Sequence, residues 1–484
     1  MIRRGREEGW LKLPITALKP WVALNGVFFN GIEIGPLPGH EERGSTVIAQ
    51  KGIAGDDTEP LMVVPRDFIV SLEAVQEHAK LDRDFKEMLD AIGDFGRTAR
   101  GAILLFLLTQ SSISSPDTPT RRFVSGPFTD YIKFLPAELL PTFWTDSERA
   151  LLTGTTLKPA VEAKLKALYR EYDALRASTA HIVWCEQEWW HEVDGLVRFE
   201  DWLAVDAMYR SRALEFPGVG DCMVPCVDMA NHSSGDSTTA LYECDSHGDG
   251  VLLLREGKTL EEGDEVTITY GDKKGACEMV FSYGFLEDTM EDARESFLDL
   301  EFPDDDPLKR AKEVVTRSAP GFKVCEKDGE IGWEGEYVWL ICVNEEDGLE
   351  FRVAQANDGT RELRVSWKEQ ELENTERLRD LLKLDAMWDV YQLRAVSVLQ
   401  SRVEAQLREL YGSDDEVIAT DHGDGSEVRD SVWNLTTRLR KLESALLDRA
   451  YSAFEDQKAK LVDSETVRRY LGSAGAEEIV EDFS

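Results

Sequence analysis

The stretch Gly263-Asp-Glu-Val-Thr-Ile-Thr-Tyr-Gly271, followed by Phe281-Ser-Tyr-Gly-Phe285, decides how this sequence is interpreted. Apolar and polar residues alternate from Glu265 to Tyr270, and this period of two predicts a strand. A tyrosine that ends a strand is more often a core residue with a bonded hydroxyl than a functional one. Tyr270 and Tyr283 are, however, both followed by glycine, which lets a backbone or a ligand approach closely. The two tyrosines therefore mark a candidate site.

A second candidate site lies upstream, at Pro225-Cys-Val-Asp-Met-Ala-Asn-His-Ser233. Taken alone, its Asn-His-Ser portion is typical of a turn, and such a pair is more often structural than functional. His232 has no partner ligand at a helical or hairpin spacing, which makes a metal role weak. The 7 cysteines are spread along the chain; only Cys222 and Cys226 are close, and no four-ligand zinc spacing occurs. We therefore predict no metal site.

The first half of the chain changes from strands to helices. Residues rich in β-branched and aromatic types, punctuated by glycine and proline, predict short strands at 27–34, 46–50 and 60–64. Apolar residues spaced by three or four predict helices between about 97 and 203. Within them, the small polar stretch Ser111–Pro119 predicts a loop.

Strands return in the second half, before a last helical region. Thr238–Cys244 and Val251–Arg255 flank a turn-rich connection and predict a hairpin. Beyond about Glu291, Tyr337–Val343 and Glu350–Val353 are strand-like, and long helices follow. One helix has an apolar stripe formed by Leu435, Leu439, Leu442 and Leu446. An acidic, glycine-rich loop is predicted at Ser413–Asp430 and an acidic tail at Glu477–Ser484. The order indicates one β domain interrupted by a helical insertion, followed by a helical domain.

Length and charge bound the class of protein. A chain of 484 residues is too long for one compact core, so two or three domains are expected. The formal net charge of −38 disfavours nucleic acid and anionic membranes and favours basic partners, although for charge by itself solubility alone is the more common explanation. The segment Met1–Trp10 lacks the apolar core of a signal peptide, and the apolar run Ala102–Leu108 is too short to span a membrane. We expect a soluble, monomeric intracellular protein of the cytoplasm, the nucleus or both.

The motifs, taken together and in order, resemble a known family. Asp228-Met-Ala-Asn-His-Ser233, Glu265-Val-Thr-Ile-Thr-Tyr-Gly271 and Tyr283-Gly-Phe285 are similar to the C-terminal half of SET domains. Their spacing matches the branch typified by the Rubisco large-subunit lysine methyltransferase. Further matches to this branch occur at Tyr131–Pro136, Phe143–Glu148, Leu152–Thr155, Arg210–Ala213 and Arg440–Leu447. The resemblance covers about residues 20 to 290 well and the remainder loosely.

The resemblance implies an α+β fold, in which a knotted β SET domain is split by a helical insertion and followed by a mainly α-helical domain. Residues 1–100 would form the first part of the SET domain with an N-terminal extension, and 101–203 the insertion. Residues 204–290 would complete the SET domain. Residues 291–484 would form the substrate-binding domain of the Rubisco methyltransferase type, although helices that merely cap the SET domain are about equally expected.

The resemblance also implies S-adenosylmethionine as the cofactor. The residues matching the family's cofactor site are Arg43, Gly44, Ser45, Arg212, Asn231, His232, Tyr270 and Tyr283. Arg212 would lie near the cofactor carboxylate, whose shape suits a guanidinium fork. Tyr270 would be the catalytic residue beside the transferring methyl. The chain departs from the family pattern at Thr46, which replaces the usual second glycine of the loop.

A lysine pocket is implied by the same resemblance. Its expected residues are Leu214, Asp228, Tyr242 (at an offset of one residue), Tyr283 and Phe285. A free lysine has a pKa near ~10.4 and is mostly protonated at neutral pH, so the site must favour the uncharged amine. A dry channel and the nearby sulfonium would do so, and alignment of amine, methyl and sulfur would supply much of the acceleration.

The expected function is S-adenosylmethionine-dependent methylation of a lysine on a non-histone protein, such as a ribosomal protein or a translation factor. The zinc-binding cysteine cluster of many histone methyltransferases does not follow Phe285. A sister group methylates histidine and has asparagine where this chain has Leu214, so a hydrophobic residue there favours lysine. The usual lysine-type residue at this position is aromatic, so the pocket departs from both patterns. A catalytically silent SET protein that only binds partners is the third possibility, and Thr46 is its main support.

Overall fold

The structure, a computed structural model, describes residues 1–39, 44–54, 59–118, 122–137, 139–327, 329–355, 361–372, 374–413 and 428–472. The predicted acidic tail and most of the predicted loop at 413–430 lie outside these ranges. The chain forms two compact units. The first comprises Met1–Trp144, Val161–Lys274 and Val280–Glu287, and the second comprises Thr145–Ala160, Gly275–Met279 and Asp288–Ser484. Within the described ranges, no helix is long and apolar enough to cross a membrane.

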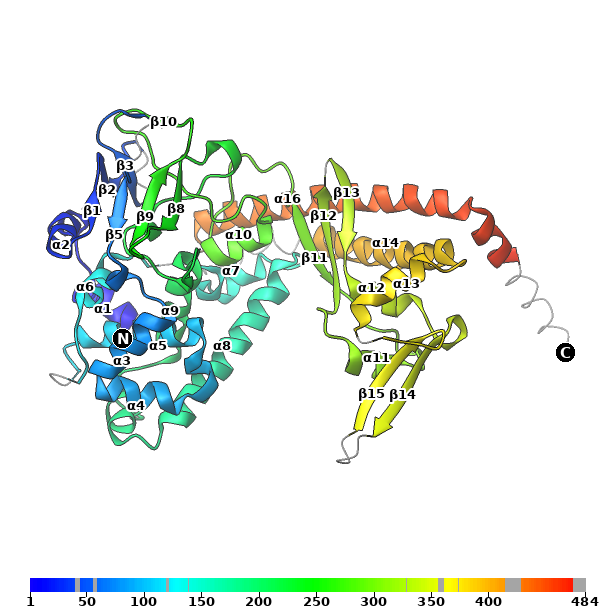
Figure 1. Cartoon of the computed structure of the whole chain (residues 1–484), viewed down its shortest axis with the longest axis horizontal. Helices are drawn as coiled ribbons and strands as arrows, with labels where there is room; N and C mark the ends of the chain where they lie inside the picture. Colours follow the sequence, from blue (N-terminus) through cyan, green and yellow to red (C-terminus); the bar gives the residue numbers. More distant parts are fainter. Residues whose placement is uncertain are drawn as a thin grey trace. The chain divides into compact units, whose positions relative to one another are not determined.

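The first unit contains an antiparallel sheet made from two distant parts of the sequence (Figure 1). Its strands, in spatial order, are β1 (Phe28–Phe29), β5 (Met62–Val64), β9 (Gly250–Leu254) and β8 (Ala240–Cys244). The predicted hairpin is confirmed by β8 and β9, which pair antiparallel with Tyr242 opposite Leu252. The central pairing of β5 with β9 places Met62 opposite the same Leu252. Strands before and after the helical segment thus build one sheet.

Short ladders surround this sheet. The remaining paired strands of the unit are β2 (Ile32–Pro36) with β3 (Ser45–Ala49), β4 (Ile53–Ala54) with β10 (Thr259–Leu260), and β6 (Leu214–Phe216) with β7 (Gly220–Cys222). The strand predicted from Glu265 to Tyr270 is wrong as a regular element, because only isolated bridges form there, Glu265 with Ile48 and Ile268 with His232. Successive residues of the segment bond to different neighbours, so no single ladder develops.

Most helices of this unit gather at the end away from the sheet (Figure 1). They are α1 (Ile2–Glu8), α3 (Leu72–Leu81), α4 (Arg83–Ala91), α5 (Ala99–Ile113), α6 (Pro127–Tyr131), the greater part of α8 (Leu157–Thr179), and α9 (Phe199–Arg212). Helix α2 (Leu18–Leu24) lies instead beside β1 and β2 (Figure 1). The predicted loop at Ser111–Pro119 is wrong for its first residues, since α5 continues to Ile113. The hydroxyls of Ser111 and Ser112 each donate a 2.7 Å hydrogen bond to a carbonyl oxygen of the preceding turn. Buried serines can therefore remain helical.

A buried carboxylate ties the helices together. Asp206 on α9 is 1% exposed and accepts a 2.6 Å hydrogen bond from Arg100 on α5. It also lies 2.9 Å from the ammonium of Lys164 on α8 and 3.4 Å from the guanidinium of Arg210. Burial alone would raise the pKa of Asp206, but these cations lower it overall. The cluster fixes the end of α9 near the candidate site.

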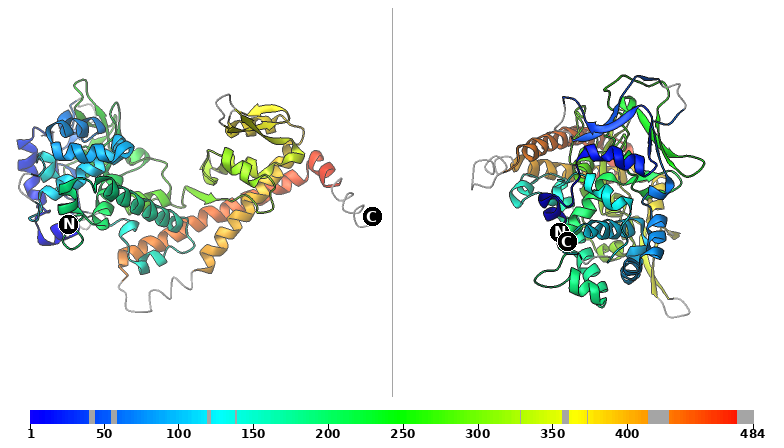
Figure 2. Two further views of the ribbon diagram at one scale, coloured as in Figure 1. Left: turned by 90° about the horizontal axis from the view of Figure 1, so that it is seen from below. Right: turned by 90° about the vertical axis from the view of Figure 1, so that its left-hand side faces the viewer.

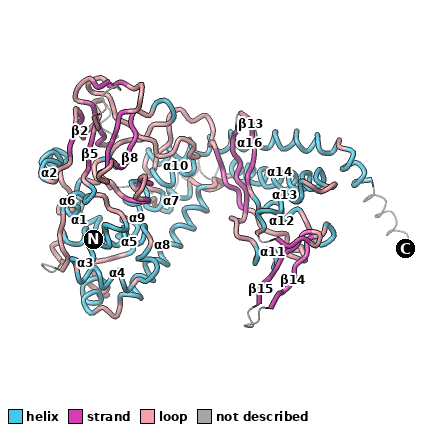
Figure 3. Tube along the Cα trace, viewed as in Figure 1, coloured by secondary structure: helices cyan, strands magenta, loops and turns pink. Residues whose placement is uncertain are grey.

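The second unit combines two three-stranded sheets with helices (Figure 3). Its strands are β11 (Glu295–Asp299), β12 (Gly321–Lys327) and β13 (Glu330–Glu334) in one sheet, and β14 (Leu349–Gln355), β15 (Arg361–Trp367) and β16 (Gln370–Leu372) in the other. Its helices include α7 (Asp146–Ala150), α11 (Lys309–Val315), α12 (Glu336–Cys342), α13 (Leu378–Lys383), α14 (Trp388–Gly412) and α16 (Asp430–Val462). Helix α10 (Ala276–Tyr283) is divided between the two units.

Two long helices form the core of the second unit. Helices α14 and α16 run side by side (Figure 2) and pack closely. The predicted leucine stripe is confirmed, with Leu439, Leu442 and Leu446 buried on α16. The strand predicted at Tyr337–Val343 is wrong, because this continuous apolar run forms the buried helix α12. A short apolar run fits a buried strand and a buried helix equally well.

A second buried carboxylate lies in this unit. Glu443 on α16 is 1% exposed and accepts two hydrogen bonds from Thr156, 3.1 Å from its backbone N–H and 2.6 Å from its hydroxyl. Burial raises the pKa of Glu443 to about 7, against the lowering effect of these hydrogen bonds.

Candidate functional site

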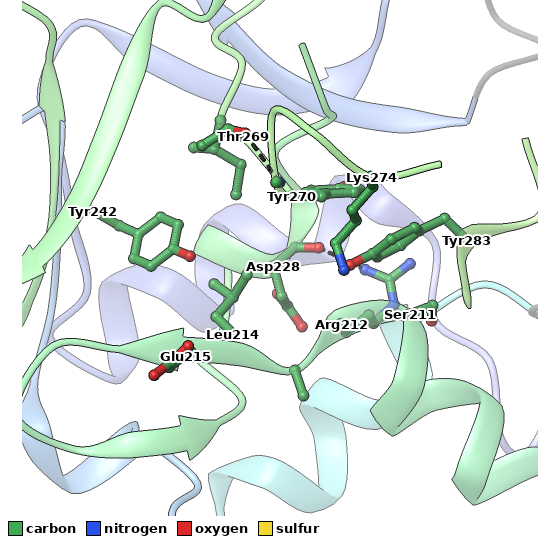
Figure 4. A pocket seen from close by; sticks show the side chains of 13 residues that line it. Ser211, Arg212, Leu214, Glu215, Asp228, Tyr242, Thr269, Tyr270, Lys274 and Tyr283 are labelled. Atoms are coloured by element: carbon green, nitrogen blue, oxygen red, sulfur yellow. Dashed lines mark hydrogen bonds between the residues drawn. The ribbon is translucent and has the colours of Figure 1, made fainter. Parts of the chain in front are cut away.

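Two cavities of the first unit share part of their walls. The first cavity, of about 330 Å³, is lined by Ser211, Arg212, Ala213, Leu214, Glu215, Asp228, Tyr242, Ile268, Thr269, Tyr270, Gly271, Lys274 and Tyr283 (Figure 4). The second cavity, of about 470 Å³, is lined by Ile15, Gly44, Ser45, Phe134, Pro136, Ser211, Arg212, Asp228, Met229, Asn231, Tyr270, Tyr283 and Phe285. The residues that line both are Ser211, Arg212, Asp228, Tyr270 and Tyr283. These five residues therefore form a wall that is common to the two cavities, called the shared wall below.

Tyr270 is held at both ends. Its backbone N–H donates a 3.0 Å hydrogen bond to Nδ1 of His232, and its hydroxyl donates a 2.8 Å hydrogen bond to the carbonyl oxygen of Ala230. Its ring stacks on His232 at 5.1 Å between centroids and packs against Tyr283 at 4.7 Å. The aromatic residue in the shared wall therefore has a fixed position.

His232 supports Tyr270 from behind. Its Nδ1 accepts from Tyr270, so the proton is assigned to Nε2, which lies 3.2 Å from Oε1 of Glu287. Ser234 donates a 2.6 Å hydrogen bond to the other oxygen of Glu287. The His232 side chain is 0% exposed, and it is not among the residues that line either cavity. The histidine thus positions Tyr270.

Asn231 faces the second cavity and is held by the segment that was predicted as a strand. Its Nδ2 donates a 2.7 Å hydrogen bond to Oε1 of Glu265, and its carbonyl oxygen accepts a 3.0 Å hydrogen bond from the N–H of Ile268. Ile268 also accepts from the N–H of Ser233 at 3.0 Å. These bonds bring the two predicted motifs, far apart in sequence, into one site.

Asp228 is placed by a buried tyrosine. The Tyr131 hydroxyl donates to Oδ1 of Asp228 and accepts a 2.7 Å hydrogen bond from the N–H of Cys226. Burial is the main cause that raises the pKa of Tyr131, and the Asp228 charge adds to it. Cys226 has a left-handed backbone with a φ of 71°, a strained conformation at a non-glycine residue that turns the chain toward Asp228.

Arg212 comes from the last turn of α9 and lies in the shared wall. Its Nη1 donates a 2.9 Å hydrogen bond to the backbone carbonyl oxygen of Asp228. The rest of the guanidinium fork is oriented by this bond, and it provides a fixed positive charge between the cavities.

The far wall of the first cavity is apolar and aromatic. Leu214 opens β6 and is 8% exposed. Tyr242 stacks on Phe216 at 5.2 Å with an interplanar angle of 23°, and Figure 4 shows its hydroxyl directed toward the middle of the cavity. Burial raises the pKa of Tyr242, and the nearby Tyr283 adds to this effect. Both residues predicted for the lysine pocket at this wall therefore lie on it.

The remaining predicted residues do not all lie at the cavities to which they were assigned. Gly44 and Ser45 line the second cavity, whereas Arg43 lies outside the described residues. Phe285, predicted for the lysine pocket, lines the second cavity and is not among the residues of the first. Thr46 is 1% exposed, is not among the residues lining the second cavity, and its Oγ1 has no hydrogen-bond partner within the described ranges. Thr46 thus lies in the core, away from the cavity surface.

Several lining residues were not predicted. Ile15, Phe134 and Pro136 lie on the second cavity. Phe134 and Pro136 belong to a quoted motif, Tyr131–Pro136, but nothing in their spacing relates them to Tyr270. Lys274 on the first cavity was missed for the same reason, although it lies only four positions after Tyr270. Within the described part of the chain, no group of three or more His, Cys, Asp or Glu side chains could hold a metal ion.

Comparisons with known proteins agree on one fold. No protein-family model matches the sequence. SET domain-containing protein 8 of Schizosaccharomyces pombe is 27% identical over 354 residues, which cover 71% of this chain and 74% of that protein. The crystal structure of the SET domain of LSMT bound to methyllysine and AdoHcy matches with a TM-score of 0.61 and 18% identity, covering 98% of this chain and 100% of that one. Rubisco LSMT bound to sinefungin and monomethyllysine matches with a TM-score of 0.59 and 17% identity, covering 97% and 99%.

Proposed function

We propose that this chain, which has the SET fold of the Rubisco LSMT type, is an S-adenosylmethionine-dependent protein-lysine N-methyltransferase. The observation that carries the proposal is the wall shared by the two cavities, where Tyr270, Tyr283 and Arg212 lie. Methyl transfer between two large reactants needs one site for each and a narrow passage where the reacting atoms meet. The two cavities would supply the two sites, and the reacting atoms would meet at the shared wall.

The second cavity suits the cofactor. Its apolar wall, with Phe134, Pro136 and Phe285, fits the flat adenine ring, and Arg212 fits the carboxylate of the amino-acid end. Gly44 has a φ of 81°, and among the described residues a Cβ added there would meet no heavy atom within 4 Å, so Gly44 itself does not crowd the cavity. Solved structures with the same fold are described as bound to AdoMet and to AdoHcy. When bound, S-adenosylmethionine would supply an electrophilic methyl group at the shared wall.

The first cavity suits a lysine side chain. Leu214 and Tyr242 would contact the apolar methylenes, and Tyr270 would lie near the amine. The Tyr270 hydroxyl donates its proton to Ala230, so its oxygen presents acceptor lone pairs that can orient the N–H groups of the incoming amine. Main-chain carbonyl oxygens of the site would add weak C–H···O contacts to the methyl group. These groups would align the amine for in-line transfer.

We further propose that the substrate is a basic, non-histone protein, such as a ribosomal protein or a translation factor, in the cytoplasm, the nucleus or both. The net charge of −38 supports a basic partner. Residues 291–484 would dock this partner, and the enzyme would act as a monomer. The position of Leu214 in the first cavity supports lysine over histidine. The burial of Thr46 away from the second cavity weakens the argument that its replacement of glycine silences the protein.

Two measurements on one preparation test the proposal. Calorimetry should detect micromolar binding of S-adenosylmethionine, with a matching rise in melting temperature. Transfer of a labelled methyl group to proteins of a lysate, followed by mass spectrometry, should identify methylated lysines. Binding without transfer would leave only a silent binding protein, and methylation confined to histidine would favour the sister activity. No binding by the folded chain would refute the cofactor assignment.

A further inference from the structure

Lys274 places a positive charge in the first cavity. Its Nζ lies 5.6 Å from the centroid of the Tyr283 ring, within the range of a cation–π contact. Figure 4 shows its side chain running past Tyr270 toward that ring. The ammonium of Lys274 therefore lies beside the shared wall rather than in open solvent.

Gly271 explains why the side chain takes this course. It has a φ of 130°, and a Cβ added there would come 3.0 Å from Cε and 3.1 Å from Cγ of Lys274. A side chain at position 271 would displace the lysine stem. The glycine that follows Tyr270 thus leaves room for Lys274, which makes the position of the charge a property of the local backbone.

The other charges of the cavity define the field around Lys274. Arg212 adds a second cation from the end of α9. The anions are Asp228, bonded to Tyr131, and Glu215, which is exposed on β6 at the opposite side of the cavity. The remaining titratable lining groups, Tyr242, Tyr270 and Tyr283, are tyrosines. The two cations are on residues near the shared wall, whereas Glu215 is remote from it (Figure 4).

We propose that Lys274 keeps the amine of the substrate lysine uncharged at the shared wall, so that its lone pair is available for methyl transfer. The inference rests on the proposed function and adds a residue to it. A like charge nearby disfavours an ammonium, which must lose its proton to water before it can react. The amine nitrogen then forms the N–CH3 bond as the S–CH3 bond breaks with its electron pair on sulfur. Removal of Lys274 would leave Arg212 as the one cation among the described lining residues, against Asp228 and Glu215, and the balance would move toward the unreactive ammonium.

The test compares charged and uncharged probes. The probes are Nα-acetyl-lysine amide, an ammonium at pH 7, and Nα-acetyl-norleucine amide, its uncharged analogue, each titrated by NMR into protein saturated with S-adenosylhomocysteine. Lys274→Met should bind the lysine probe about ten-fold more tightly than the wild type does, which corresponds to a rise of about one unit in the pKa of the bound amine. Its affinity for the norleucine probe should be unchanged. The acid limb of kcat for the lysine probe should move up by about one pH unit.

Three variants control for structure and net charge. Lys274→Arg keeps the charge. It should have the wild-type ratio of lysine to norleucine affinity and the wild-type pH profile of kcat. Lys273→Met removes the same charge from an exposed neighbour that is not among the lining residues, and should change neither. Glu215→Gln, at an exposed position, should shift both readouts in the opposite direction, and it carries the test if Lys274→Met fails to fold. An unchanged ratio of lysine to norleucine affinity in Lys274→Met would overturn the inference while leaving methyl transfer itself unaffected. Absence of transfer by the wild type would instead overturn the proposed function.

Discussion

The hydroxyl of Tyr270 lies 2.8 Å from the carbonyl oxygen of Ala230, one residue before the Asn231–His232 pair. The bond joins the two motifs from which the site was predicted. It also fixes which way the hydroxyl proton points, so the oxygen's acceptor side is left for a substrate amine.

Tyr270→Phe should separate the structural contribution of this hydroxyl from its catalytic one. Loss of one hydrogen bond should cost about 1 kcal/mol of unfolding free energy, and cofactor affinity should be nearly unchanged. The methylation rate should fall ~10-fold or more, because one positioned polar group is worth at least ~1.4 kcal/mol in a transition state. Tyr172→Phe, which removes a 3.3 Å hydrogen bond to the carbonyl oxygen of Val197 outside both cavities, is the matched control. Wild-type turnover by Tyr270→Phe would remove it from the catalytic role.

Arg212→Gln should weaken cofactor binding. The variant retains a donor for the backbone oxygen of Asp228 but loses the positive charge in the shared wall. We expect the Kd for S-adenosylmethionine to rise by ~10-fold or more, since a charge-assisted hydrogen bond is worth about 1.5–3 kcal/mol. Arg255→Gln also removes a guanidinium bonded to a carbonyl oxygen, that of Gly235 at 2.9 Å, but lines neither cavity. Equal affinities for the two variants, measured by calorimetry, would contradict the assignment.

Asp206→Asn should destabilise the first unit. It would leave Arg100 and Lys164 without the buried charge that they share, and breaking such a cluster typically costs ~3–5 kcal/mol. The pKa of Asp206 is lower in the folded state than in the unfolded chain. Its contribution to the free energy of unfolding is therefore complete above the ordinary pKa of an aspartate, and it is lost as the pH falls through the lowered pKa of the folded state. Denaturant unfolding at pH 7 and pH 3 should therefore show a smaller difference between wild type and variant at pH 3. Asp94→Asn, at a 96% exposed partner of Arg97, should leave stability unchanged.

Glu443 should affect the pH dependence of stability in the opposite direction to Asp206, and Glu443→Gln tests this. The folded state holds the Glu443 proton more tightly, with a pKa of about 7. Stability should therefore fall as the pH rises from about 4.5 through 7, as the unfolded chain releases a proton that the folded chain retains. Glu443→Gln should lack this pH dependence. The free energy of unfolding of the variant minus that of the wild type should therefore be roughly 2–3 kcal/mol larger at pH 8 than at pH 5. Glu404→Gln, at a half-exposed position of α14, is the control. If the melting temperatures of wild type and variant change equally between pH 5 and pH 8, Glu443 does not titrate in this range.

The sequence predicted the elements whose patterns are local. Turn residues between Thr238–Cys244 and Val251–Arg255 were enough for the β8–β9 hairpin, and leucine spacing was enough for the buried face of α16. The segment Glu265–Tyr270 has a strand-like alternation, yet its partners are separate pieces of chain, so a local pattern could not predict isolated bridges. Tyr337–Val343 was assigned the wrong element because all-apolar runs have no period.

The candidate site was predicted only where motif and family resemblance coincided. Tyr270, Tyr283 and Arg212 were predicted and lie in the shared wall. Lys274 and Ile15 also line the cavities, but their positions depend on backbone geometry and on packing between distant segments. No periodicity or spacing encodes such contacts.

The order β1-β5-β9-β8 has a consequence for synthesis of the chain on the ribosome. Strand β5 obtains its partner β9 only after about 190 further residues have emerged, since Met62 pairs with Leu252. At ~5–20 residues per second, the edge of β5 waits for roughly 10–40 s, with the helical insertion made in the interval. Helices formed from local contacts assemble in far less time, so the insertion can fold while β5 is paired only with β1. The insertion that splits the β domain thus occupies the interval in which that domain is most exposed to aggregation.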